Sequence, residues 1–243
     1  MNFEFQAIGI VHSCFVEKFG IPRQPGLAAA ARGQLELLPP FDDPQTLEGL
    51  EQCSHLWLQF VFHRPPSDQW RPRVRPPRLG GNRSLGVFAT RSPLRPNPIG
   101  LSVVKFDGVT QRQGRIWLEL SGIDLLDGTP VLDIKPYVPY TDLVPEAENQ
   151  FAGAAPTWAT VVFSSEAQAA CRALTERLGQ DWEALIRQIL QQDPRPQYQK
   201  PDPQRRYGMT LKDAEVHWRY EPADEGEHRL VVTAVTPRRP PSG

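Results

Sequence analysis

The sequence contains little cysteine and histidine, and it has no long apolar run. Its three cysteines, Cys14, Cys53 and Cys171, are odd in number and far apart, which argues against a disulfide scaffold and a cysteine zinc site. The five histidines show no metal-binding spacing, so we expect no metal. No apolar stretch approaches the roughly 20 residues that cross a bilayer, and no secretory signal pattern opens the chain. We therefore expect a soluble protein of the reducing cytoplasm.

Acidic charge is nearly absent from one segment of the chain. The 243 residues are almost neutral overall, with 27 basic and 28 acidic side chains. Residues 64–95, however, hold eight arginines and one acid, Asp68, so this segment carries +7 and the remainder −8. A concentrated basic segment in a neutral protein indicates a polyanionic partner. The alternative is a solvated, arginine-rich loop. The arginines are Arg64, Arg71, Arg73, Arg75, Arg78, Arg83, Arg91 and Arg95.

The first 140 residues alternate short apolar segments with glycine and proline, a pattern typical of strands and turns. This spacing predicts a mainly β region, either an antiparallel barrel or a sandwich. Residues 48–53 fit one helical turn. The expected strands cover residues 3–12, 33–38, 55–62, 85–90, 101–109, 115–120 and 131–135.

The C-terminal part has a different pattern and predicts a small α+β domain. Its first helix has a capping-box signature that begins at Ser165, and the helix ends at Gly179. Asp181 caps a second helix, whose apolar stripe is typical of a core face. The expected strands of this part cover residues 158–163, 209–220 and 228–235. We divide the chain into a barrel domain (1–142), a linker or wrapping segment (143–157) and a C-terminal domain (158–243).

The most informative segment is the proline-rich loop within residues 86–102. Three prolines stiffen this loop between two apolar runs, because proline fixes φ and removes a backbone donor. A stiff loop that presents Arg91, Arg95 and Asn97 suits a charged ligand, although a proline-rich turn with solvated arginines has the same composition. A second segment, 122–142, contains the turn signal Asp127-Gly128 and places several acids near the basic region.

These two segments and several further blocks resemble the TsaA-like family, also called TrmO, of S-adenosylmethionine-dependent tRNA methyltransferases. The blocks are rare and ordered, so the resemblance is specific. It spans residues 5–142 and extends into the C-terminal part through Asp193-Pro194-Arg195-Pro196 and Tyr198. The other blocks are Pro22-Arg23-Gln24-Pro25-Gly26, Ser54-His55-Leu56-Trp57, Arg75-Pro76-Pro77-Arg78-Leu79-Gly80-Gly81, Ala89-Thr90-Arg91-Ser92, Arg95-Pro96-Asn97-Pro98-Ile99-Gly100, Asp127-Gly128-Thr129-Pro130 and Asp133-Ile134-Lys135-Pro136-Tyr137.

The resemblance implies a single β-barrel core that binds S-adenosylmethionine through loops, since the chain lacks the Gly-x-Gly-x-x-Gly turn of Rossmann folds. Arg91 would pair with the cofactor carboxylate, the turn 124–127 would receive its amino group or ribose, and Leu101 would pack on the adenine. Alternatively, Arg91 pairs with Asp127, and Leu101 belongs to the core. The implied cofactor contacts are Pro22, Arg23, Gln24, His63, Arg64, Arg91, Leu101, Asp124, Leu125, Leu126, Asp127 and Gly128.

The implied methyl acceptor is the N6 nitrogen of threonylcarbamoyladenosine next to the anticodon of tRNA, of the threonine tRNA type. A hydrogen-bond acceptor would help the N6 proton to leave, and the candidates are Asn97, Asp133, Tyr137 and Tyr140. The expected tRNA contacts are Arg73, Arg75, Arg78, Arg95, Arg195, Tyr198 and Lys200. The resemblance also implies a homodimer. Two alternatives are a noncatalytic nucleic-acid-binding barrel and a methyltransferase of a small molecule.

Overall fold

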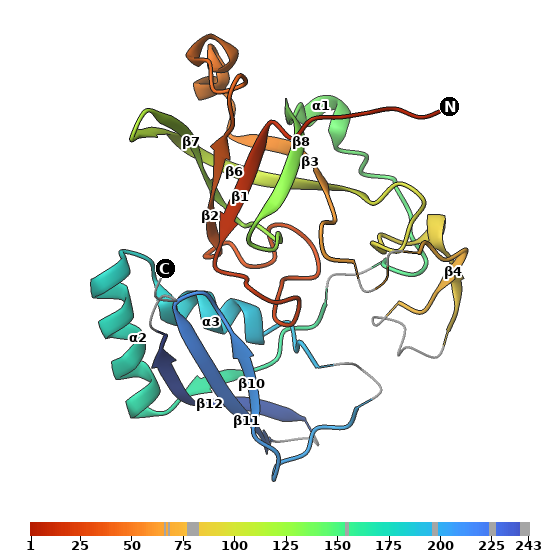
Figure 1. Cartoon of the computed structure of the whole chain (residues 1–243). Coiled ribbons are helices and arrows are strands. Elements are labelled where there is room, and N and C mark those ends of the chain that lie inside the picture. Colours follow the sequence, from red (N-terminus) through yellow and green to blue (C-terminus); the bar gives the residue numbers. More distant parts are fainter. Residues whose placement is uncertain are drawn as a thin grey trace.

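The structure is a computed structural model in which a β-barrel lies beside a mixed sheet with two helices (Figure 1). It describes residues 1–65, 67, 69–76, 83–153, 156–195, 199–223 and 227–238. None of the helices in these residues has the length and apolar character of a membrane span. Within the same residues, no three His, Cys, Asp or Glu side chains are grouped as metal ligands would be.

Six antiparallel strands close into the barrel, in the order β1-β2-β7-β6-β3-β8. Their side chains alternate between the interior and the outer face, as in β3, where Leu56, Leu58 and Phe60 are buried. The closed barrel core expected from the sequence is confirmed. The strands are β1 (Gly9–Ser13), β2 (Arg32–Leu37), β3 (His55–Val61), β6 (Ile99–Arg112), β7 (Arg115–Ser121) and β8 (Thr129–Pro136).

Two expected strands of the barrel region differ from the structure. Strand pairing of β1 begins only at Gly9, and the side chains of Phe3 and Phe5 before it are exposed. The expected strand 85–90 is a two-residue strand, β5 (Leu85–Gly86), followed by a 3-10 turn, Val87–Ala89. The Thr90 hydroxyl donates to the Val87 carbonyl at 2.8 Å and closes this turn instead of extending the strand.

Short elements decorate the barrel. Strand β5 pairs with β4 (Arg73–Val74) in a small ribbon, and α1 (Pro139–Asp142) follows β8. The single turn expected over residues 48–53 is the 3-10 helix Leu50–Gln52, and a second 3-10 helix, Pro44–Leu47, precedes it.

The C-terminal sheet has the order β10-β11-β12-β9, with β9 parallel to β12 and the other pairs antiparallel. Its expected strand 209–220 is two strands, since the chain turns back at residues 211–213. Helix α2 is capped by Ser164, one residue before the expected position, whereas Asp181 caps α3 as expected. The elements are β9 (Val161–Phe163), α2 (Ser165–Leu178), α3 (Trp182–Leu190), β10 (Tyr207–Thr210), β11 (Ala214–Pro222) and β12 (His228–Pro237).

The two parts share one hydrophobic core. A single cluster of buried side chains runs from the barrel interior, including Leu118, to the C-terminal sheet, including Trp218. Backbone bonds cross the junction, because Phe15 bridges Leu211 and the Lys212 amide donates to the Cys14 carbonyl at 2.8 Å. The C-terminal part is therefore packed against the barrel and not merely tethered to it.

Candidate active site

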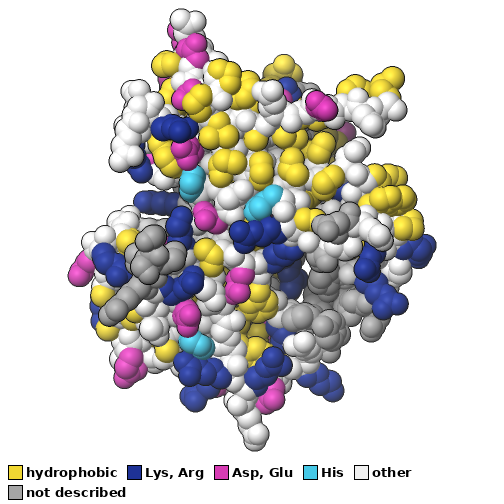
Figure 2. Space-filling view, viewed as in Figure 1, with side chains coloured by type: hydrophobic (Ala, Val, Ile, Leu, Met, Phe, Trp, Pro, Cys, Tyr) yellow, Lys and Arg dark blue, Asp and Glu magenta, His cyan; other side chains and the backbone are white. Residues whose placement is uncertain are grey.

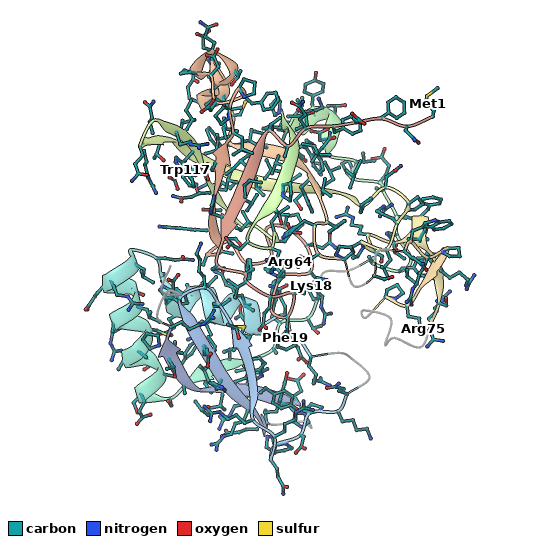
Figure 3. All side chains as sticks on the ribbon, viewed as in Figure 1. Met1, Lys18, Phe19, Arg64, Arg75 and Trp117 are labelled. Atoms are coloured by element: carbon teal, nitrogen blue, oxygen red, sulfur yellow. The ribbon has the colours of Figure 1, made fainter. Side chains whose placement is uncertain are left out.

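Four loops of the barrel meet at the end that faces the C-terminal part: residues 14–31, 62–65, 87–98 and 122–128. Backbone hydrogen bonds join them, from Gly26 to Gly122, from Phe62 to Pro98 and from Asp127 to Phe15, each at 2.8 Å. Figure 3 shows Lys18 and Arg64 at this junction, and Figure 2 shows basic side chains along it. The fold thus gathers loops that are up to a hundred residues apart in the sequence.

Gly100 explains how the proline-rich loop enters the barrel. A Cβ added at Gly100 would meet the ring of Phe60 at 2.2 Å, so only glycine lets β6 begin against this ring. Before it, the Arg95 guanidinium donates to the Thr90 carbonyl at 3.1 Å and folds the loop on itself. The predicted tRNA contact Arg95 therefore also braces the loop that presents Arg91.

The Arg91 guanidinium donates a hydrogen bond to the side-chain carbonyl of Gln24, which lies in the Pro22-Arg23-Gln24 block. This contact brings together two of the predicted cofactor segments. Arg91 does not pair with Asp127, whose ion-pair partner in the described part of the chain is Lys212, at 3.5 Å. The alternative that Arg91 pairs with Asp127 is therefore wrong.

Asp124 supplies a carboxylate beside this contact. Its side chain is half-buried and accepts a hydrogen bond of 2.7 Å from the hydroxyl of Ser102, which is buried in β6. The loss of water around the carboxylate raises the pKa of Asp124 to about 6, although Ser102 and the positive charge of Arg91 favour the ionised form. The structure adds Ser102, a residue that the sequence analysis did not select, as the partner of Asp124.

The Asp127-Gly128 turn is built by backbone contacts. The Asp127 carboxylate accepts from the Ser13 amide at 2.8 Å, and Gly128 has a φ of +80°, which favours glycine. Leu125 is buried in the core, so its predicted contact with a cofactor would have to come from its backbone. The Leu126 carbonyl accepts the Thr129 hydroxyl at 2.6 Å. Much of this turn is therefore structural.

His63 lies against this turn. Its Nδ1 is 3.4 Å from the Thr129 hydroxyl, and its buried Nε2 has no hydrogen-bond partner among the described residues. Burial and the neighbouring Arg64 hold the pKa of His63 below its usual range. A Cβ at Gly128 would lie 3.8 Å from Nε2, so the glycine leaves space beside the imidazole. A neutral imidazole with an unused polar atom is suited to a polar ligand.

Two hollows adjoin the contact between Gln24 and Arg91. The first has a volume of about 730 Å³ and lies between Leu27, Phe88 and Phe151. The second has a volume of about 510 Å³ and extends to the end of α3 in the C-terminal part. The two hollows share the side chains of Arg23, Gln24, Pro76, Thr90 and Arg91.

Arg23 joins the barrel loops to the C-terminal part. Its guanidinium donates to the Asp193 carbonyl at 3.0 Å, and its amide donates to the Gln192 side chain at 3.4 Å. Pro22 before it is buried. No sequence signal pointed to Gln192, because a single glutamine after an apolar helix carries no recognisable pattern.

Of the other predicted residues, the structure places Asn97 on the gathered loop 87–98, but it does not bring the rest to this junction. Leu101 is 49% exposed on the outer face of β6, so the alternative that it belongs to the core is wrong. Tyr137 follows the far end of β8, with its ring tilted against that of Trp57, roughly 20 Å or more along the strand from Gly128. Tyr140 is 91% exposed, Asn97 is exposed, and Asp133 is paired with Lys135 at 2.9 Å.

The predicted tRNA contacts are spread over both parts. Arg73 donates to the Ser84 carbonyl at 2.9 Å and braces β4 against β5, whereas Arg75 and Lys200 are exposed. Arg195 pairs with Asp193 at 2.8 Å and lines the second hollow. The remaining two, Arg78 and Tyr198, lie outside the described residues.

Two family models match the chain, one over the barrel and one over the C-terminal part. The family model described as the tRNA-methyltransferase O N-terminal domain matches residues 10–143, and the one described as the TrmO C-terminal domain matches residues 156–238. A putative S-adenosylmethionine-dependent methyltransferase of Pseudomonas aeruginosa, RcsF, is 59% identical over 224 residues, or 92% of this chain and 95% of the relative.

A tRNA (adenine(37)-N6)-methyltransferase of Escherichia coli is 45% identical over 239 residues, which cover 98% of this chain and 99% of the relative. The crystal structure of TrmO from Pseudomonas aeruginosa is 50% identical and superposes with a TM-score of 0.81, covering 97% of this chain and 99% of that one. Both the barrel and the C-terminal part are matched at this level. The chain therefore belongs to the TrmO family.

Proposed function

We propose that the protein is an S-adenosylmethionine-dependent tRNA methyltransferase that acts on the N6 nitrogen of adenine 37. The observation that carries this proposal is the 45% identity, over 98% of the chain, to a tRNA (adenine(37)-N6)-methyltransferase. The alternative of a noncatalytic nucleic-acid-binding barrel has no such support. The gathered loops, with Arg91, Gln24 and Asp124, give the reaction a place on a fold that lacks the Rossmann glycine turn.

The residues at the junction fit such a cofactor. The unused Nε2 of His63, the space at Gly128 and the half-buried Asp124 carboxylate provide polar groups on the predicted cofactor segments. When bound, S-adenosylmethionine supplies a methyl group whose bond to a sulfonium sulfur breaks as the new bond to nitrogen forms. In our proposal Arg91 pairs with its carboxylate and Asp124 with its ammonium group, while the stiff loop keeps the reacting groups in line.

The proposed acceptor is the threonylcarbamoylated adenosine and not plain adenosine. Because Arg91 pairs with the cofactor carboxylate, the carboxylate of this acceptor would pair with Arg95 or Lys135, and a bare adenine offers these cations nothing. Acylation also makes the N6 proton easier to lose, so a strong base is not required. Asn97, Asp133 and Tyr137 remain the proposed hydrogen-bond acceptors for the N6–H group. Asn97 is on the gathered loops, Asp133 is in β8, and Tyr137 directly follows β8.

Transfer of a labelled methyl group to tRNA, followed by nucleoside mass spectrometry, tests this function. We expect label in tRNA that carries the threonylcarbamoyl group, and none in tRNA from cells that cannot make it until that group has been added in vitro. Equal incorporation into both tRNAs would refute the proposal that the acceptor is the threonylcarbamoylated adenosine, but it would not refute the proposal that S-adenosylmethionine is the cofactor. No incorporation into either, with no binding of S-adenosylmethionine in calorimetry, would refute the function.

We also propose that a homodimer completes the site in the cytoplasm. Leu101 is exposed on the barrel, and Tyr137 lies far from the gathered loops, so a second copy would have to bring such residues to the cofactor. Apolar side chains cover much of the barrel face in Figure 2. Sedimentation equilibrium should give twice the chain mass, and Leu101→Asp should shift the protein toward the monomer. A wild-type monomer at micromolar concentration would contradict the dimer.

The C-terminal part is proposed to help capture tRNA, and the division at residues 142 and 158 stays a proposal because both parts share one core. Arg195 and Lys200 lie on this part, Arg73 and Arg75 lie on the barrel side, and the basic segment 64–95 of the sequence contains Arg73, Arg75 and Arg78. Replacing these last three arginines with alanine should flatten the dependence of tRNA affinity on salt, because fewer counterions are released. An unchanged salt slope would make them solvated surface residues.

A further inference from the structure

The second hollow contains an exposed aromatic ring with a rigid backing. Phe19 lines this hollow and is 38% exposed, while its ring lies parallel to that of Trp218, at a centroid distance of 6.2 Å and an angle of 5°. Trp218 is fully buried and is stacked in turn on Tyr207. Figure 3 shows Phe19 at the junction of the two parts. The Phe19 ring is therefore held in one orientation, as a platform for a flat ligand requires.

The wall around this ring is cationic. The side chains that line the hollow include Lys18, Arg23, Arg75, Arg91 and Arg195, and no acid is among the described lining residues. Arg195 is paired with Asp193, but Lys18 and Arg75 have no ion-pair partner in the described part of the chain. Unpaired cations around an apolar face indicate a ligand that has both a flat ring and negative charge.

The volume and lining of the hollow further limit the kinds of ligand that it can hold. A volume of about 510 Å³ is within the usual range for a site that holds one small molecule or one nucleotide. A simple anion would not need the Phe19 platform, and an apolar ligand would not need the cations. Because this hollow shares Arg23, Gln24 and Arg91 with the first one, its occupant would lie next to the predicted cofactor contacts.

We propose that this hollow binds one unpaired nucleotide of the tRNA anticodon loop, close to the methylated adenine. Its base stacks on Phe19, and its phosphates face Lys18 and Arg75. This proposal rests on the proposed function and adds a second base contact to it. A base anchored here fixes the loop backbone, so the target adenine is presented to the methyl donor in one orientation.

The test combines variants with RNA that lacks single bases. Methyl transfer is measured on threonylcarbamoylated anticodon stem-loops, each abasic at one loop position, with wild type, Phe19→Ala and Phe19→Tyr. Phe19→Ala should lower kcat/KM on the intact stem-loop about tenfold, and Phe19→Tyr should restore it. On the stem-loop that lacks the stacked base, Phe19→Ala should cause no further loss. A similar loss at every abasic position would overturn the proposal.

Two controls distinguish loss of this subsite from a general effect of removing an aromatic ring and from loss of cofactor binding. Phe3→Ala removes an aromatic ring that is more exposed than Phe19, on the N-terminal segment, where no RNA contact is proposed, and should leave kcat/KM unchanged. Calorimetry should give Phe19→Ala the wild-type affinity for S-adenosylmethionine; a large loss would overturn the subsite by making the hollow part of the cofactor site.

Equilibrium binding of the unmodified stem-loop judges the subsite even if no methyl transfer occurs. Phe19→Ala should weaken this binding, and Lys18→Gln should lower its salt slope by about one charge. Wild-type binding and salt slope in both variants would overturn the proposal, whereas a catalytically silent wild-type protein that binds RNA through Phe19 would refute only the proposed function. Thermal unfolding of each variant verifies that it is folded.

Discussion

The barrel and the C-terminal sheet solve the problem of open strand edges differently. Every barrel strand is paired on both sides, whereas the C-terminal sheet ends at β9 and β10. The barrel therefore leaves no strand edge open, but its gathered loops have no such closure. Gly20 of the longest loop lies against Met209 and Ile189, and the Ala30 amide bonds to Gln188 at 2.8 Å. The C-terminal part thus supports the loops and not the barrel wall.

The largest effect on stability is expected from a substitution in the core that the two parts share. Trp218→Ala removes a fully buried side chain that contacts Phe19 across the junction. The free energy of unfolding should fall by about 3–5 kcal/mol, as is typical for a buried aromatic residue replaced by alanine. Denaturant unfolding should remain a single transition, because the two parts unfold together.

Arg219→Gln, a change at the exposed neighbour in β11, is the matched control and should leave the unfolding midpoint nearly unchanged. Two separate transitions in Trp218→Ala, with the barrel transition at its wild-type midpoint, would show that the parts are independent. In that case the loops would be ordered by the barrel alone.

The second prediction concerns the barrel side of the junction. Arg91→Ala should lower the affinity for S-adenosylmethionine at least about tenfold, since the loss of one member of a desolvated charge pair commonly costs about 2–5 kcal/mol. Calorimetric titration measures this affinity. Arg112→Ala, on the distant β6–β7 hairpin, should bind as the wild type does. Equal affinity in Arg91→Ala, with unchanged thermal unfolding, would remove Arg91 from the site.

The sequence predicted the elements that carry their own signal. Alternating apolar residues identified most of the barrel strands, and the caps at Gly179 and Asp181 gave the end of α2 and the start of α3. It did not reveal contacts made only in the fold, such as the hydrogen bond from Ser102 to Asp124 or the stacking of Phe19 on Trp218. Such partners are far apart in the chain, and no local pattern marks them.

The family resemblance predicted sets of site residues that hydrophobic periodicity could not predict. The structure brings only some members of these sets together. Gln24 and Arg91 meet, while Leu101 points outward on the barrel and Tyr137 lies at the far end of β8. A sequence motif records that residues serve one function, but it does not record whether one copy of the chain brings them together.

A third prediction uses the pH dependence of stability. The pKa of Asp124 is about 6 in the folded protein, above its ordinary value of 3.8, so the folded state binds this proton more tightly than the unfolded chain. Stability is then lost as the pH rises from about 4 to 6, and it stays lost above that range. Asp124→Asn cannot ionise and should be more stable than wild type at pH 8 by about 1–3 kcal/mol.

Thermal unfolding at pH 4 and pH 8 measures this difference, which should nearly vanish at pH 4. The same variant should bind S-adenosylmethionine less tightly, because its neutral amide has no negative charge to form an ion pair with the ammonium group. A variant that is less stable than wild type at pH 8 would mean that the Asp124 carboxylate is well solvated or well paired in the fold. Burial of the Asp124 carboxylate would then not destabilise the site, and packing of the C-terminal part would have no such cost to offset.

The smallest predicted effect tests whether the C-terminal part tunes the cofactor loop. Tyr220 donates to the Asp193 carboxylate at 2.6 Å, and the Asp193 carbonyl accepts from Arg23. Asp193 has a φ of +44°, an uncommon conformation for a residue other than glycine, so its side-chain bonds help to fix this carbonyl. Tyr220→Phe should raise the KM for S-adenosylmethionine roughly threefold and leave kcat within about twofold, for a loss of about 1 kcal/mol in stability.

Tyr207→Phe is the matched control, because its hydroxyl accepts from the Asp202 amide at 3.2 Å and does not contact Asp193. The two rings meet edge to face in the same aromatic cluster, so both variants lose a similar hydroxyl from similar surroundings. If both lower stability and only Tyr220→Phe raises KM, the C-terminal part positions Arg23. If both raise KM equally, the effect is general loosening of the cluster, and Asp193 has no special role in cofactor binding.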